Sequence, residues 1–301
     1  MLAVFALGTA QSGKDRQSPK FNVTVNLVSI DAEVLDRSAN PVTGLSKHDF
    51  VVKEDGKVVT ITNFARLRHR PVSLAVLLDR SFISLKQFDT AKRFVFRLMY
   101  LLGHGDEMAI YTFDIKGAYL EQDFTKDRGL LVNTLDNLSV PSSGTTNFFL
   151  ELLGPPPETA AAIDTARLNL LKTHNGRKAL LIISNEFRGL GPVTVQHIED
   201  SGCTVLTLGF PNPLALSLSL GGDQFSMAQL AQQSGGREFS EDRDITKICR
   251  SIASSLKNYY ALGYLASGER ARSRPRHVEV SIPGHDYIIN ARRTYLPGNI
   301  G

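Results

Sequence analysis

Apolar and polar positions alternate between residues 21 and 66, as they do in β-strands that bury one face. The alternation changes phase between residues 27 and 28, which indicates a β-bulge or a change of sheet face. Asp55-Gly56 separates two short strand patterns and is a typical two-residue β-hairpin turn. This part of the chain is therefore predicted to be β-structure.

From Pro71 onward, short apolar runs alternate with helical patterns. Residues 72–78 are mostly apolar at both strand phases, which is typical of a strand buried on both sides in a parallel sheet. Further strands are predicted at 108–113, 178–184 and 203–209, with an edge strand at 117–124. Helices are predicted at 88–102, 130–138, 147–153, 158–171, 225–234 and 244–256, and strand patterns return at 259–265, 276–282 and 287–293. This order predicts an α/β fold with a doubly wound, mostly parallel sheet, framed by N- and C-terminal β segments.

We expect four segments along the chain. Residues 1–20 are interpreted as a signal-like leader and linker, 21–70 as the N-terminal β segment, and 71–256 as the doubly wound domain. Residues 257–301 supply C-terminal strands that are expected to pack with the N-terminal β segment. Residues 1–10 are apolar and small, like the core and cleavage end of a secretory signal, so we expect an exported protein (periplasmic, secreted or at the cell surface).

Composition adds few constraints. Hydrophobic residues make up 42% of the chain and charged residues 21%, which indicates an ordinary globular protein. The net charge of +4 comes from scattered Lys and Arg residues without a nucleic-acid-binding motif, so no nucleic-acid partner is expected. No stretch is long and apolar enough to predict a membrane span. Cys203 and Cys249 are predicted to be small buried side chains rather than a disulfide.

Asp79-x-Ser81 directly follows the apolar run and so stands at the carboxyl end of a buried strand. Open α/β sheets bind ligands at that edge. Carboxylate and hydroxyl oxygens are the ligands that hard divalent cations such as Mg²⁺ prefer. Loops at 142–147, 184–187 and 210–224 are expected to converge on the same edge. The sequence therefore points to a candidate site there.

Several motifs share their order and spacing with one known family. They are Pro41-Val42-Thr43-Gly44-Leu45, Ser201-Gly202-Cys203-Thr204-Val205, Ser234-Gly235-Gly236-Arg237 and Tyr260-Ala261-Leu262-Gly263-Tyr264. With them, the chain resembles a von Willebrand factor A-type domain, and more narrowly the VWFA-related domain family described from acidobacterial proteins. The resemblance covers nearly the whole chain. It implies a doubly wound domain that binds proteins.

The resemblance also implies a metal-ion-dependent adhesion site, built on Asp-x-Ser-x-Ser with a Thr and an Asp from two further loops. Asp79 and Ser81 match, Thr145 is the best match to the loop Thr with Thr146 beside it, Ile83 replaces the second Ser, and Asn185 replaces the last Asp. Ile83 has no oxygen and Asn185 has no charge, so binding of Mg²⁺ or Mn²⁺ is expected to be weak or lost, and no cofactor is expected. The alternative interpretation is that Asp79 and Ser81 cap the following helix.

A protein-binding surface at this edge does not require the cation. Phe82 and Phe187 stand in neighbouring loops, and Leu214, Leu216 and Leu218 alternate with serines in a third. Exposed together, these side chains would form an apolar patch that contacts a protein partner. The same residues can instead pack on the domain's own core, or the Leu–Ser alternation can form a short strand.

Catalysis finds little support in the sequence. The seven histidines are isolated, and no nucleophile elbow or phosphate-binding loop is present. We therefore expect a non-enzymatic, adhesion-type binding module with a degenerate metal site. The alternative is a structural or assembly scaffold with a decayed site, for which an exposed edge strand near residues 21–34 would be the mark. A hydrolase is a distant third hypothesis.

Overall fold

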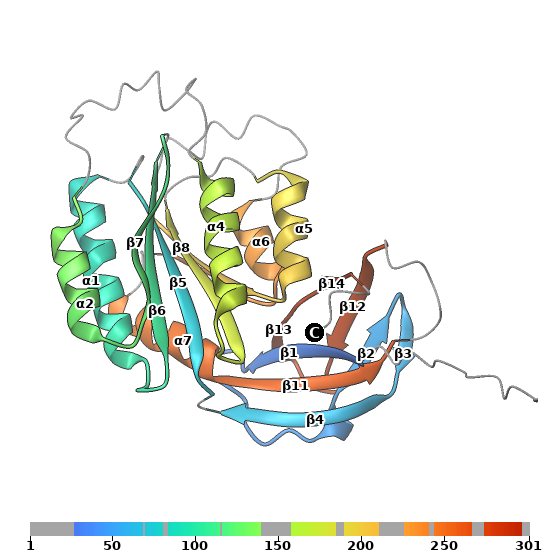
Figure 1. Cartoon of the computed structure of the whole chain (residues 1–301). Helices are drawn as coiled ribbons and strands as arrows, with labels where there is room; N and C mark the ends of the chain where they lie inside the picture. The colour runs from blue at the N-terminus through green and yellow to red at the C-terminus, as the bar shows by residue number, and fades with distance from the viewer. Residues whose placement is uncertain are drawn as a thin grey trace, which may run out of the picture.

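The computed structural model describes residues 27–68, 70–80, 84–114, 116–139, 158–184, 190–210, 226–240, 244–266 and 274–296. Their strands form one six-stranded sheet and two four-stranded sheets. The six-stranded sheet belongs to an α/β domain, and the two smaller sheets form a separate β lobe at one end of it (Figure 1). The predicted fold class, a doubly wound domain framed by β segments, is confirmed.

The strand order of the large sheet is β10-β9-β8-β5-β6-β7, and all neighbours are parallel except β6 and β7. β7 is therefore an antiparallel edge strand, as the sequence predicts. The bounds are β5 (Val72–Asp79), β6 (Glu107–Asp114), β7 (Gly117–Thr125), β8 (Arg177–Ser184), β9 (Thr204–Gly209) and β10 (Glu238–Ser240).

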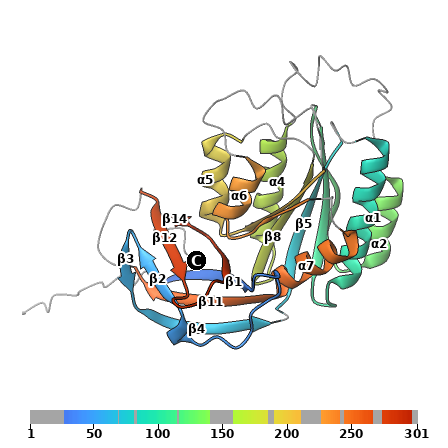
Figure 2. The ribbon, with the colours of Figure 1, turned by 180° about the vertical axis from the view of Figure 1, so that it is seen from behind.

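Helices cover both faces of this sheet (Figures 1 and 2). One layer is α1 (Leu85–Leu101), α2 (Arg128–Asn137) and α7 (Ile245–Lys257), and the other is α4 (Thr159–Lys172), α5 (Pro192–Ser201) and α6 (Met227–Gln233). On β5, Leu74, Val76 and Leu78 enter the first core, while Ala75 and Leu77 enter the second. Double burial explains why this strand is apolar at both phases.

Three details differ from the predicted elements, and the first is the short strand β10, which the sequence pattern did not predict. Helix α5 was also not predicted, although Gly191 at its N-cap, Pro192 at its first turn and Gly202 after its end are ordinary boundary signals. Helix α1 is capped by Ser84, whose hydroxyl oxygen accepts from the Gln87 backbone N–H at 3.3 Å. The alternative interpretation of Asp79 as the cap of this helix is therefore wrong. The helix predicted at 147–153 lies outside the described residues.

The β lobe packs a sheet of order β13-β1-β11-β4 against a sheet of order β14-β12-β2-β3. The first contains β1 (Leu27–Leu35), β4 (Ile61–Arg68), β11 (Asn258–Leu265) and β13 (Ile288–Ala291). The second contains β2 (Val51–Glu54), β3 (Lys57–Val59), β12 (Arg276–Ser281) and β14 (Thr294–Tyr295), and the short 3-10 helix η1 (Lys47–Asp49) precedes it. Strands from the two ends of the chain thus share both sheets.

The β2–β3 hairpin has the predicted turn, because Asp55 and Gly56 both have positive φ, of 48° and 79°. Strand β1 lies between β13 and β11, pairing with β13 over residues 32–35 and with β11 over residues 27–32. Only Ala32 thus has a partner on both sides among the described strands, so most of β1 pairs with one strand alone. The scaffold hypothesis, for which an exposed edge near residues 21–34 would be the mark, stays an alternative.

The chain passes from the β lobe into the α/β domain and back again at neighbouring positions. Strand β4 ends at Arg68 shortly before β5, and α7 continues directly into β11 at Asn258. Arg68 and Asn258 are paired across β4 and β11. The Lys257 ammonium forms a buried ion pair with Asp106 and donates to the Arg70 carbonyl at 3.3 Å, which fixes the junction.

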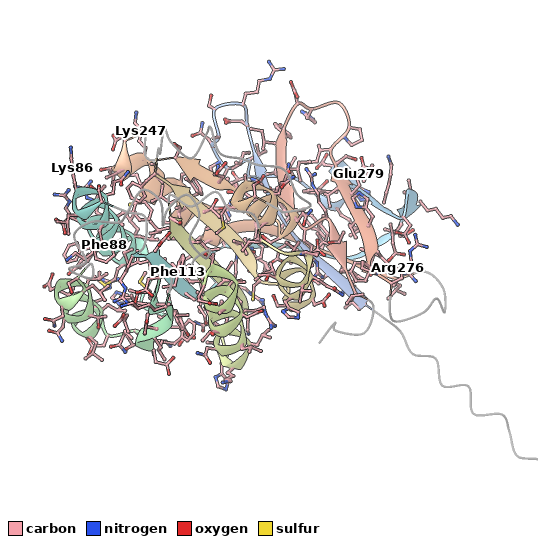
Figure 3. All side chains as sticks on the ribbon, turned by 90° about the horizontal axis from the view of Figure 1, so that it is seen from above. Lys86, Phe88, Phe113, Lys247, Arg276 and Glu279 are labelled. Carbon is pink, nitrogen blue, oxygen red and sulfur yellow. The ribbon has the colours of Figure 1, made fainter. Side chains whose placement is uncertain are left out.

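Seen from above, Lys86 of α1 and Lys247 of α7 lie on the α/β side of the molecule, and Arg276 and Glu279 lie on β12 at the opposite side (Figure 3). Among the described helices, none is long and apolar enough to cross a membrane.

Candidate functional site

The candidate site lies at the carboxyl edge of the large sheet, where β5 ends at Asp79 and its parallel neighbour β8 ends at Ser184. The Ser184 hydroxyl donates to the Asp79 carboxylate with an Oγ–Oδ2 distance of 2.5 Å. Asp79 is fully buried and Ser184 is 6% exposed. A hydrogen bond is needed here because a carboxylate removed from water is costly without donors.

Asp79 and Ser184 flank the topological switch point of the sheet. In the chain β5 is followed by α1 and β8 by α5, and these helices cover opposite faces. The connections leaving β5 and β8 therefore diverge, and the divergence opens a crevice at their carboxyl ends. Asp79 was predicted at this edge from its place after an apolar run, and the strand order shows that it also lies beside the crevice.

The Arg80 side chain lies against the β6–β7 hairpin, on the side of β5 opposite to β8. Its guanidinium forms ion pairs with Asp114 at 3.2 Å and Glu121 at 3.7 Å, and lies 4.8 Å from the centre of the Tyr119 ring. Its backbone N–H donates to the Phe113 carbonyl at 2.9 Å. These contacts fix the residue after Asp79 to the neighbouring strands, so the edge of β5 is held on both sides.

The structure brings together only part of the predicted site. Asp79 is at the expected edge. The other predicted ligands and partner-binding residues lie outside the described residues: Ser81, Thr145, Asn185, Phe82, Phe187, Leu214, Leu216 and Leu218. Their roles stay predictions.

The described residues do not make a cation site by themselves. They contribute one carboxylate, from Asp79, and one hydroxyl, from Ser184, and the two are hydrogen-bonded to each other. Mg²⁺ requires near-octahedral oxygen coordination, with further ligands from protein or water. Across the part of the chain that the structure describes, no cluster of three or more His, Cys, Asp or Glu residues is placed to hold a metal ion.

Sequence reasoning missed the roles of Ser184 and Asp114. Each is the last residue of its strand, and each becomes a partner of β5 or its continuation only through the strand order. A polar residue that ends a buried apolar run was the available signal at both positions. Cys203 and Cys249 are buried and unbonded to each other, as predicted.

The α/β part of the chain has the doubly wound, mostly parallel sheet that the sequence resemblance to von Willebrand factor A-type domains implies. No protein-family model and no curated protein matches the chain.

Similar solved structures include an aerotolerance-related membrane protein from Bacteroides fragilis with multiple mutations to serines, at 15% identity and a TM-score of 0.46, over 62% of this chain and 98% of that one. The VWA domain of SpRpn10 is 11% identical with a TM-score of 0.41, over 60% of this chain and 94% of that one. A von Willebrand factor type A protein from Catenulispora acidiphila is 10% identical with a TM-score of 0.40, over 78% of this chain and 74% of that one. At these identities and scores the similarities assign no activity to the chain.

Proposed function

We propose that this chain is a non-enzymatic, adhesion-type module that binds a protein partner through the loops at the carboxyl edge of its large sheet. The observation that carries the proposal is the position of Asp79 and Ser184 at the switch point between β5 and β8, where α/β sheets bind ligands. The partner-contacting residues that we propose are Phe82, Phe187, Leu214, Leu216 and Leu218.

We further propose that the cation site of A-type domains is degenerate in this chain. In an intact site, the resemblance implies that an acidic side chain of the partner completes the shell of the cation. Ile83 and Asn185 remove one hydroxyl ligand and one negative charge from that set. Binding would then rest on apolar and polar contacts of the loops, without Mg²⁺ or Mn²⁺.

Peptide display on the folded chain tests the binding surface. Peptides selected on the wild-type chain are expected to bind Phe82→Ser and Phe187→Ser at least about tenfold more weakly, because each substitution removes an aromatic anchor. Leu168→Ser, at an exposed position of α4, is the matched control and should bind normally. Selected peptides that bind the Phe82 and Phe187 variants as well as they bind the wild type would contradict the proposal.

A thermal melt tests the cation site. A ligand that binds only the folded state at a hundredfold excess over its dissociation constant adds about 2.7 kcal/mol to stability. We expect no difference in melting temperature between millimolar Mg²⁺ and chelator, both for the wild type and for Asp79→Asn. A rise that depends on the metal and is lost in Asp79→Asn would show a working cation site and overturn this part of the proposal.

The proposed export of the chain rests on the small, apolar residues 1–10. Cell fractionation of the full-length chain beside a variant with Leu7→Arg tests it, because a charge in the apolar core of a secretory signal blocks export. Equal recovery of both proteins in the cytoplasmic fraction would refute export.

A further inference from the structure

A second hollow of the molecule lies far from the carboxyl edge, between the α/β domain and the β lobe. We call it the inter-lobe cleft. Its volume is about 850 Å³, within the usual range of roughly 300–1,000 Å³ for small-molecule sites. Both lobes line it, mainly with polar and small residues, among them Ser29, Asp31, Arg177, Lys178, Gly202 and Arg292.

The cleft contains an ion pair whose arginine is buried and whose aspartate side chain is 40% exposed. Arg177, at the start of β8, is 3% exposed, and its Nη1 lies 3.1 Å from the Asp31 carboxylate of β1. The Arg177 guanidinium also lies 3.9 Å from the centre of the Tyr259 ring. Since Asp31 belongs to the β lobe and Arg177 to the α/β domain, this pair crosses the floor of the cleft. It neutralises one positive charge.

Arg292 supplies a second positive charge next to the same carboxylate. Its Nη2 donates to the Ser29 carbonyl at 2.9 Å, and no carboxylate of the described residues lies within 4.0 Å of it. Its Nε–H has no acceptor among the described residues. Burial lowers the pKa of Arg292, because the protein around it disfavours the charged form.

The charges around Asp31 do not balance. Arg177, Arg292 and Arg70 all act on the Asp31 carboxylate, which is a single negative charge. Burial of the cleft raises the pKa of Asp31, with the three arginines opposing that shift. Asp31 thus offers at most one negative charge to three guanidinium groups.

The other cations of the cleft are already occupied. Lys178 donates to the carbonyls of Thr173 and Asn175 at the end of α4, where a cation also offsets the negative end of the helix dipole. Arg167 forms an ion pair with Asp164 at 3.1 Å. Asp200 is a second carboxylate of the lining, and Arg167 acts on it as well. Among the guanidinium groups that line the cleft, Arg292 is therefore the one without an ion pair in the described part of the chain.

We propose that the inter-lobe cleft binds a small ligand carrying an oxyanion, a carboxylate or a phosphate, through Arg292. A guanidinium binds such groups with charge-assisted, often bidentate hydrogen bonds, which are stronger in a partly desolvated site than in water. The bound oxyanion supplies the negative charge that Asp31 alone lacks. Because Ser29, Asp31 and Arg292 lie in one lobe and Arg177 in the other, the ligand contacts both lobes and binds at their junction.

Isothermal titration calorimetry on the full chain tests this site, with inorganic phosphate in one arm and succinate in the other, at constant ionic strength. Binding of either probe supports the proposal, and the arm that binds identifies the oxyanion. We expect Arg292→Met to weaken binding by about tenfold or more, from the loss of a charged hydrogen bond. Arg293→Met is the matched control, since Arg293 is the neighbouring residue and is exposed, and it should bind like the wild type.

Arg292→Lys keeps the positive charge but loses the planar guanidinium that can form two parallel hydrogen bonds. This variant should bind phosphate or succinate with intermediate affinity. It also guards against misfolding, because the side chain keeps its length and its charge. Absence of heat with both probes at millimolar concentration, or equal affinity in Arg292→Met and Arg293→Met, would overturn the proposal. Asp79→Asn should leave the affinity unchanged, because the cleft and the carboxyl edge are at opposite ends of the sheet, so each proposal fails independently of the other.

Discussion

A buried carboxylate in the β lobe allows a stringent test of the packing of its two sheets. Glu54 at the end of β2 is 1% exposed in its side chain and forms an ion pair of 2.8 Å with Arg276 of β12, which is 9% exposed. The hydroxyl of Tyr295 donates to the same carboxylate. Burial raises the pKa of Tyr295, so its hydroxyl keeps the proton that it donates.

Glu54→Gln keeps the size and one acceptor oxygen of the side chain but removes its charge. The Arg276 guanidinium then loses its charge interaction with the Glu54 carboxylate while it stays in the same buried position. Breaking a buried pair by removing one partner costs about 3–5 kcal/mol. We expect a loss near the lower end, about 3 kcal/mol, because the amide oxygen of Gln still accepts a hydrogen bond.

The same two strands provide a matched control. Lys53 and Glu279 are paired in register one residue away, 3.6 Å apart, with side chains 38% and 55% exposed. Figure 3 labels Glu279 and Arg276 on β12. An exposed pair contributes about 0–1 kcal/mol, so Glu279→Gln should change stability by less than about 1 kcal/mol.

Urea denaturation followed by circular dichroism measures both free energies of unfolding. A double-mutant cycle with Arg276→Met separates the pair from the packing of each side chain. If Glu54→Gln and Glu279→Gln lose equal stability, or if the coupling energy between Glu54 and Arg276 is below about 1 kcal/mol, burial does not control the strength of this pair and the reasoning fails.

Three further predictions follow from contacts described by the structure. Gly236→Ala would place a Cβ 1.9 Å from the Val205 carbonyl oxygen, so we expect a loss of about 3 kcal/mol or more in urea denaturation, whereas Gly191→Ala meets nothing within 4 Å and should lose less than about 1 kcal/mol. Ser84→Ala removes the N-cap of α1 and should cost about 1 kcal/mol in the same assay. Burial raises the pKa of Cys249 from 9.0 to about 11, so the unfolded thiol ionises first and stability falls as pH rises from 9 to 11; Cys249→Ala should show a smaller fall, and an unchanged slope would contradict this.

Local patterns predicted the fold because most helices and strands carry a recognisable hydrophobic pattern or turn signal within a few residues. Residues 72–79 are buried on both sides of the sheet, so their side chains are mostly apolar at both phases, which is typical of a central parallel strand. Asp55-Gly56 needs two positive φ values, which few other residue pairs tolerate. Helix α5 was not predicted because only three of its ten residues are buried, and so few apolar positions give a weak helical periodicity of hydrophobic residues. The three are Thr194, Val195 and Ile198.

Contacts between residues far apart in the chain could not be predicted from the sequence. Asp79 was predicted at the sheet edge from its place after an apolar run, but its partner Ser184 is 105 positions away and meets it only because β8 lies beside β5. Asp31 and Arg177, 146 positions apart, form their pair across two lobes. Pairings of this kind depend on strand order and on how the lobes pack, and a single sequence does not encode either in a local pattern.

The place where the α/β domain joins the β lobe has a mechanical consequence. Entry and exit are neighbouring antiparallel strands, since Arg68 pairs with Asn258, and insertion at such adjacent ends leaves an inserted domain folded as its own unit. Tension applied along the β lobe passes from β4 to β11 through their shared hydrogen bonds and bypasses the inserted domain. The large sheet and its carboxyl edge therefore stay unloaded until β4 and β11 separate, so a pull on the β lobe reaches the carboxyl edge only after the hydrogen bonds between these two strands have begun to break.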